Sequence, residues 1–127
     1  MAEEFNSSKP IYLQVADKIY SAIVRGEIKS GEKLPSVRDT AVQMGVNPNT
    51  IQRTYAEMER EGVVETKRGQ GTFVRENSDV VIALRNRIKS DIIQNFVQSM
   101  QEIGLSKEEM VQGVRQFLGE GEEHYDD

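Results

Sequence analysis

Apolar residues recur every three or four positions near the start of the chain, at Tyr12, Val15, Ala16, Ile19, Ile23 and Val24. This spacing predicts an amphipathic helix. Pro10 suits the first turn of that helix, and Gly26 suits its end. The turn-rich segment 26–31 follows, and Lys33 with Leu34 is expected to add a short extended piece.

Two further helices follow with almost no chain between them. Ser36 opens the first of these, with Asp39 three residues on as its capping-box partner, and Gly45 stops it. Asn47 caps the next helix, and Pro48 occupies its first position. The buried stripe of this third helix is expected at Ile51, Tyr55 and Met58. The short glycine-containing turn indicates a helix-turn-helix, although other helical hairpins share this pattern.

Two strand-like runs come after the third helix. Residues 63–67 and 72–75 are rich in Val, Thr and Phe, and residues 68–71, Arg-Gly-Gln-Gly, have the composition of a hairpin turn. Three helices followed by a β-hairpin, in that order, describe a winged helix-turn-helix. The predicted fold class is therefore α+β.

The pattern changes after residue 76. Ser78 with Asp79 is expected to cap a long helix, and Ser106 with Glu109 forms a capping box for a final one. Two amphipathic helices are too few to bury their own apolar faces, so we expect a homodimer. The predicted dimer interface consists of Leu84, Ile88, Ile92, Phe96, Met100, Ile103, Val114 and Phe117.

Composition narrows the function classes. The 127 residues, 37% apolar and 29% charged, suffice for one core of ordinary domain size. There is no cysteine and the one histidine is His124, which excludes thiolate sites, disulfides and His-based triads. No apolar run approaches the ~20 residues that span a bilayer, and the N-terminus lacks a signal-peptide pattern. We expect a cytoplasmic protein that is not an enzyme, with no cofactor, no metal and no membrane partner.

The net charge of −5 does not exclude a nucleic-acid partner, because the charge is unevenly distributed. Residues 1–76 hold eleven basic and eleven acidic side chains, whereas residues 77–127 hold five and ten. Three parts are therefore expected: a DNA-binding domain over 1–76, a dimerisation region over 77–118 and an acidic disordered tail over 119–127.

In a helix-turn-helix, residues at the start of the third helix meet base edges. Asn and Gln side chains can pair with adenine, and Arg with guanine or phosphate. Phosphate contacts are expected from Arg38 and the wing, and sequence choice from Asn49, Gln52 and Arg53. The predicted DNA-binding residues are Ser36, Arg38, Asn47, Asn49, Thr50, Gln52, Arg53, Lys67, Arg68, Gly69, Gln70 and Gly71.

Several of these residues have a purely structural alternative. Asn47 can act as a cap alone, Arg53 can face solvent or pair with Glu57, and Gly69 and Gly71 can simply permit positive φ in a turn. Two other functions are a winged-helix protein-interaction module without specific DNA binding, and an enzyme. The cations at the third helix and wing disfavour the first, and the absence of an acid–base or metal constellation disfavours the second.

Four segments resemble the GntR family of bacterial transcription regulators: 34–38 (LPSVR), 45–50 (GVNPNT), 55–62 and 68–74 (RGQGTFV). The wing, the NPNTIQ segment and the short C-terminal part look most like the YtrA-like subfamily. The resemblance implies a homodimeric repressor that binds a palindromic operator in double-stranded DNA, often controlling a neighbouring transporter operon. It places Arg38, Asn49, Thr50, Gln52 and Gly69 on DNA-contacting positions.

Two differences from the family limit what can be transferred. Many relatives carry Arg where this chain has Pro48 and Gln52, so their base preference does not carry over. Larger relatives have a long metabolite-binding or aminotransferase-like C-terminal domain, whereas about 50 residues follow the wing here. An effector pocket of several hundred Å3 inside one subunit is therefore not expected. A pocket between subunits or beneath the wing stays open, and any small-molecule effector is unknown.

Overall fold

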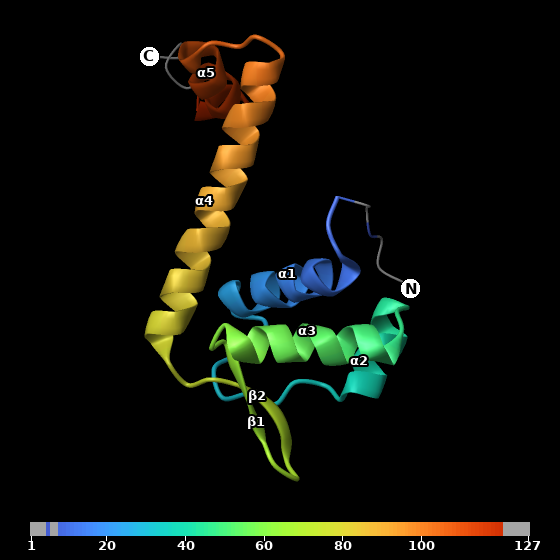
Figure 1. Cartoon of the computed structure of the whole chain (residues 1–127). Helices are drawn as coiled ribbons and strands as arrows, with labels where there is room; N and C mark the ends of the chain where they lie inside the picture. The colour runs from blue at the N-terminus through green and yellow to red at the C-terminus, as the bar shows by residue number, and fades with distance from the viewer. Residues whose placement is uncertain (1–4, 6–7, 121–127) are drawn as a thin grey trace. The chain divides into compact units, whose positions relative to one another are not determined.

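The computed structural model describes residue 5 and residues 8–120. Its elements, in chain order (Figure 1), are α1 (Ile11–Val24), α2 (Val37–Met44), α3 (Pro48–Arg60), β1 (Val64–Lys67), β2 (Gly71–Val74), α4 (Ser78–Glu102) and α5 (Lys107–Leu118). This confirms the predicted α+β winged helix followed by C-terminal helices. No helix in the described part of the chain is both long enough and apolar enough to cross a bilayer.

The chain divides into two compact units, Met1–Asn86 and Arg87–Asp127. The division falls inside α4, beyond the boundary at residue 76 drawn from the sequence. Leu84, which is only 4% exposed, lies in the part of α4 that belongs to the first unit. The predicted acidic tail lies outside the described residues except for Gly119 and Glu120.

The core of the first unit is formed where α3 packs against α1 and α2. Ile51 and Met58 of α3 are completely buried, as the helical spacing predicted. From α1, Val15, Ile19 and Ile23 are buried, at 0%, 6% and 3% exposure. Pro10 is the N-cap of α1 rather than a residue of its first turn, because its carbonyl accepts hydrogen bonds from the first-turn amides while its own backbone is extended.

The two caps predicted for the helix-turn-helix are both present. The Ser36 hydroxyl accepts a hydrogen bond from the Asp39 amide at 3.1 Å, and the Asn47 side chain accepts one from the Asn49 amide at 2.7 Å. Gly45 ends α2 with φ of 70°, a left-handed conformation that glycine adopts without steric cost. These local interactions fix where α3 begins and therefore which residues its N-terminal turn presents.

The wing is an antiparallel hairpin in which Val64 pairs with Val74 and Lys67 pairs with Gly71. The chain before α2 bonds the free edge of β2: the Leu34 amide donates to the Thr72 carbonyl at 2.8 Å, and Lys33 forms a bridge with Phe73. This confirms the short extended piece at Lys33 and Leu34. The wing is thereby joined to the segment that leads into α2.

The two C-terminal helices begin with side-chain caps. The Asn77 side chain accepts a hydrogen bond from the Asp79 amide at 3.0 Å, so Asn77 caps α4 and the prediction of Ser78 as its cap was wrong. Ser78 is already the first residue of α4, and the side chain of Asn77, one position earlier, accepts from the Asp79 amide. Ser106 and Glu109 form the predicted reciprocal capping box at the start of α5.

Candidate nucleic-acid interface

A buried hydroxyl pair attaches the recognition helix α3 to the start of α2. The Tyr55 hydroxyl donates to the Pro35 carbonyl at 2.7 Å, and it also lies 2.7 Å from the Thr40 hydroxyl. A phenol has one proton, so Thr40 must be the donor in the second hydrogen bond. Burial raises the pKa of Tyr55, which keeps this hydroxyl neutral and able to donate.

A second hydrogen bond attaches α3 to α1. The Thr54 hydroxyl, which is completely buried, lies 2.9 Å from both the Tyr12 carbonyl and the Thr50 carbonyl and donates to them. The recognition helix is thus held on two sides, by Tyr55 toward α2 and by Thr54 toward α1. Its exposed face is consequently positioned by the core rather than by surface contacts.

The exposed face of α3 carries the predicted base-contacting residues. Asn49, Gln52 and Arg53 are exposed and Thr50 is half-buried. The Asn47 side-chain oxygen is used as the cap of α3, so the capping alternative for Asn47 is confirmed. Its side-chain amide group makes no hydrogen bond within the described residues, so the cap does not prevent a DNA contact.

The two sides of α3 have different neighbours. On one side, Glu59 accepts hydrogen bonds from the amide and hydroxyl of Thr66 in β1, at 3.1 and 3.3 Å. On the other side, the Arg53 guanidinium lies over the Tyr12 ring, 4.1 Å from its centroid. Arg53 therefore faces α1, not the wing, which the sequence did not show.

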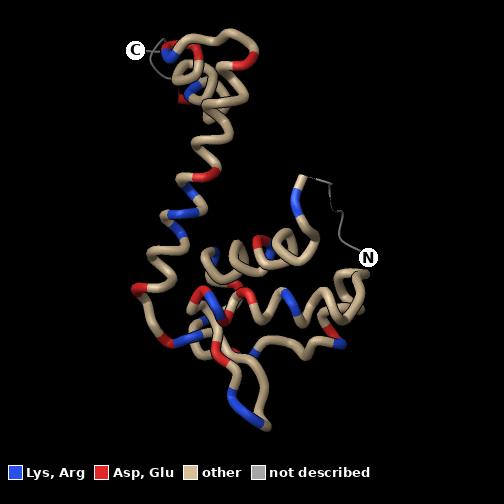
Figure 2. Tube along the Cα trace, in the orientation of Figure 1, with Lys and Arg blue, Asp and Glu red and all other residues tan. Residues whose placement is uncertain are grey.

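The wing and the start of α2 share a groove of about 400 Å3. Four of the predicted wing residues and Ser36 line it, together with Lys33, which sequence analysis did not select. The Lys67 ammonium lies 4.6 Å from the centroid of the Phe73 ring. Figure 2 shows basic residues, and no acidic residue, at the tip of the hairpin. Lys33 could not be found by helical spacing, because only the strand pairing with Phe73 brings it to the wing.

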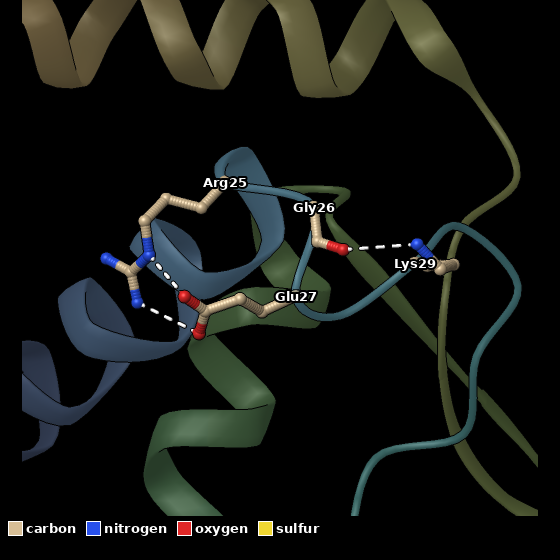
Figure 3. A network of polar contacts seen from close by, with 4 residues as sticks. All are labelled: Arg25, Gly26, Glu27 and Lys29. Carbon is tan, nitrogen blue, oxygen red and sulfur yellow. Dashed lines mark hydrogen bonds and ion pairs between the residues drawn. The ribbon is translucent and has the colours of Figure 1, made fainter.

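Several cations of the first unit that lie away from the predicted interface are paired with carboxylates. Arg25 donates to the Glu27 carboxylate at 2.7 and 3.1 Å (Figure 3), and Arg75 lies 3.3 Å from Glu65. Arg60 pairs with Glu57 and lowers the pKa of that carboxyl. Within the described residues, no ion pair is made by the predicted contacts Arg38, Arg53, Lys67 and Arg68.

The ion pair between Arg60 and Glu57 bears on the predicted alternative that Arg53 pairs with Glu57. The Glu57 carboxylate is held by both Nε and Nη2 of Arg60, and Arg53 forms no ion pair with it among the described residues, although the charge of Arg53 adds to that of Arg60 in lowering the pKa of Glu57. Four cations without an ion pair, near a helix N-terminus and a hairpin tip, are an arrangement that favours a phosphate backbone. No group of three Asp, Glu or His side chains among the described residues is placed to hold a metal ion.

The winged helix-turn-helix geometry agrees with the comparison to known families. The family described as "Bacterial regulatory proteins, gntR family" matches residues 11–74, half of the chain. The chain belongs to the gntR family. It is accordingly a DNA-binding transcriptional regulator and not an enzyme, as the sequence predicted.

Individual relatives agree with the YtrA-like resemblance of this GntR chain. It is 54% identical over 121 residues to the uncharacterized HTH-type transcriptional regulator YhcF of Bacillus subtilis (strain 168), covering 95% of this chain and all of YhcF. It is 45% identical over 76 residues to the HTH-type transcriptional repressor YtrA of the same organism, covering 60% of this chain and 58% of YtrA. A GntR family transcriptional regulator from Listeria monocytogenes has a similar structure, with a TM-score of 0.81 and 39% identity over 88% of this chain and 98% of that one.

The second unit of this GntR regulator carries an apolar groove of about 750 Å3 between α4 and α5. Phe96 and Val114 of the predicted dimer interface line it, with Ile93, Met110 and Leu118 among the other residues. The groove is open because the two helices leave their apolar faces uncovered instead of closing a core. It is therefore a surface groove and not an effector pocket enclosed in one subunit, and the expectation about such a pocket stays a prediction.

The remaining predicted interface residues differ in exposure. Phe117 is 92% exposed, Ile103 71% and Ile92 63%, whereas Ile88 and Met100 are half-buried. Leu84 is buried within the first unit, so it is not on an open surface.

Proposed function

We propose that this GntR-family regulator is a homodimeric repressor that binds a palindromic operator in double-stranded DNA. The observation that carries the proposal is the apolar surface of the second unit. Met110 is the one buried residue of the described part of this unit, at 7% exposure, while Phe117 at 92% is almost completely exposed. A soluble chain rarely leaves bulky apolar side chains together on its surface unless a partner covers them.

A second copy of the chain is the partner with the matching surface. In a twofold dimer the same patch meets itself, so each groove can receive an exposed apolar residue of the other copy. We assign Phe117 as the anchor that enters the partner's groove, because large aromatic side chains contribute most at interfaces. Ile92 and Ile103 extend the same apolar surface.

A twofold dimer presents two recognition helices and two wings. Its half-sites are then expected about one helical turn apart, or a multiple of it, as an inverted repeat. The uncompensated Arg38, Lys67 and Arg68 would contact phosphates, and Asn49 and Gln52 would read base edges. The proposed contact surface also includes Ser36, Asn47, Thr50, Arg53, Gly69, Gln70 and Gly71.

The sign of regulation rests on similarity alone. YtrA of B. subtilis is named a repressor, which supports repression. The YtrA-like resemblance supports control of a neighbouring transporter operon, and it supports a cytoplasmic location of the protein. Transcription from the operator-bearing promoter should fall when the protein is added to a purified transcription reaction. An increase would identify an activator.

The dimer and operator are tested together by selecting bound duplexes from a random pool at near-physiological salt. An inverted repeat is expected, and sedimentation should give a dimer for the wild type and a monomer for Phe117→Asp. Gln112→Asp, on the same exposed helix but outside the groove lining, is the matched control and should remain dimeric. A single half-site, or a monomeric wild type, would contradict the proposal.

A further inference from the structure

The N-terminal half of α3 forms a second groove on the side away from the wing. This groove, of about 340 Å3, lies between α1 and α3, which run side by side (Figure 1). Its lining is Pro10, Ile11, Tyr12, Asn49, Thr50 and Arg53. It thus combines two predicted base-contacting residues with the start of α1, a segment that helix-turn-helix reasoning from sequence did not include.

The Arg53 guanidinium is held in this groove by a stacking contact. It lies 4.1 Å from the centroid of the Tyr12 ring, and the backbone of Tyr12 is fixed to α3 by the Thr54 hydroxyl at 2.9 Å. A guanidinium stacked on a ring by its face keeps its N–H groups free at its edge. The neighbouring carboxylate of Glu57 is held by Arg60, and Arg53 makes no ion pair within the described residues.

The position of Arg53 on the helix determines which part of a duplex it can reach. With 100° per residue, Gln52 lies on the side of α3 that also carries Glu59, whose carboxylate bonds β1 of the wing. Arg53 and Thr50, three residues apart, lie on the side of α1. A helix in the major groove has a sugar–phosphate strand along each side. With α3 in that groove, the side of α3 bonded to the wing would face one strand and the side next to α1 would face the other.

We propose that the Tyr12–Arg53 stack is a clamp for a backbone phosphate on the strand opposite to the wing. Arg53 contacts the phosphate, and Tyr12 is a positioning residue that holds the guanidinium edge toward it. The proposal departs from the sequence-based assignment of Arg53 to base recognition. It rests on DNA binding by the family and does not depend on a palindromic site or on dimerisation.

The clamp is tested with the full chain on two duplexes, one carrying the selected operator and one of scrambled sequence. Arg53→Ala should weaken binding to both by the same factor, on the order of fivefold near physiological salt, and should reduce the salt slope by about one. Tyr12→Phe keeps the ring and should match the wild type. Tyr12→Leu should reproduce part of the Arg53→Ala loss, and should add nothing when Arg53 is already Ala. Arg25→Ala, which removes an exposed cation already paired with Glu27, is the control and should change neither duplex.

Three outcomes would overturn the clamp. The first is an Arg53→Ala loss confined to one base position among single-base operator variants, which would make Arg53 a base-reading residue. The second is an unchanged salt slope for Arg53→Ala. The third is a Tyr12→Leu loss of equal size in the Arg53→Ala background, since Tyr12 would then act through the fold alone. If selection recovers no operator, the scrambled duplex still tests the clamp, so failure of the operator proposal is distinguishable from failure of the clamp.

Discussion

The two units of this regulator differ in what they expose on their surfaces. The first buries an apolar core, including Val15, Ile51 and Met58 at 0% exposure, and among its described residues it leaves several surface cations of the predicted interface without an ion pair. The second, in its described part, buries little more than Met110 and leaves Phe117 and Ile103 exposed. Each unit therefore exposes a kind of side chain that folded proteins ordinarily neutralise or cover. In the first unit that is charge suited to DNA, and in the second it is apolar surface suited to a protein partner.

On the dimer proposal, the first unit is stable on its own core while the second depends on a second copy of the chain. A functional surface can then be recognised by what is left uncompensated rather than by residue type alone. Arg25 and Arg53 are both exposed arginines of the first unit, but Arg25 is bound to Glu27 whereas Arg53 is held on a ring with its polar edge open.

The same substitution in the two units should give the largest difference. Met58→Ala should lower the free energy of unfolding of the first unit by about 2–5 kcal/mol, because it removes a fully buried side chain and leaves a cavity. Met110→Ala should leave this transition unchanged and weaken the dimer instead. Urea denaturation followed by tyrosine fluorescence reports mainly the first unit, because Tyr12, Tyr20 and Tyr55 lie there. An equal loss from Met110→Ala would show that the units unfold as one.

A smaller effect is expected where α3 is joined to α2. Tyr55→Phe should cost about 1–3 kcal/mol, because the buried Thr40 hydroxyl, 3% exposed, loses its acceptor. Since burial raises the pKa of Tyr55 above its usual value of 10.0, the neutral hydroxyl is favoured in the folded state. Its contribution to stability is complete below pH 10 and is lost as the pH rises through the folded-state value.

The pH dependence gives this prediction a second readout. Unfolding free energies measured on both proteins at a series of pH values should converge above pH 10, with Tyr55→Phe declining less steeply. Parallel curves for the two proteins would mean that the Tyr55 hydroxyl is as hydrated in the folded state as in the unfolded one. The same measurement on Tyr12→Phe, at the surface of the first unit, is the control.

Local chemistry explains why so much of the fold could be predicted. The caps at Ser36, Asn47 and Ser106 depend on residues two or three positions away, and the buried stripe of α3 depends on helical spacing alone. Contacts of that range join residues that are only a few positions apart, so the sequence pattern alone predicts them. The motif resemblance then supplied the order of elements and the family.

Contacts between distant segments could not be predicted in this way. Lys33 reaches the wing only because its segment pairs with β2, and Arg53 reaches Tyr12 only because α1 packs against α3. The ion pair of Glu57 with Arg60 was not predicted either, because a helix allows both the i,i+3 spacing to Arg60 and the i,i+4 spacing to Arg53. Side-chain partners at such positions depend on tertiary packing, which a single sequence does not reveal.

Two matched caps give the smallest and most discriminating test of the comparison. Ser36 and Ser106 each accept a hydrogen bond of 3.1 Å from the amide three residues on, one in each unit. Replacing either by Ala should cost about 1 kcal/mol of helix stability. Ser36→Ala should lower the unfolding free energy of the first unit and weaken DNA binding, because Ser36 also lines the wing groove. Ser106→Ala should leave the first unit unchanged and should weaken the dimer, because the loss falls on the start of α5.

Threonine at either position retains the capping hydroxyl and should restore most of the loss, which separates the cap from a general effect of substitution. Urea denaturation and sedimentation of both pairs of variants provide the measurement. If Ser106→Ala lowered the stability of the first unit as much as Ser36→Ala does, the second unit would be supporting the first within one chain. The exposed faces of α4 and α5 would then have to be explained by intrachain stability, and the argument from uncovered apolar surface to a second copy would lose its basis.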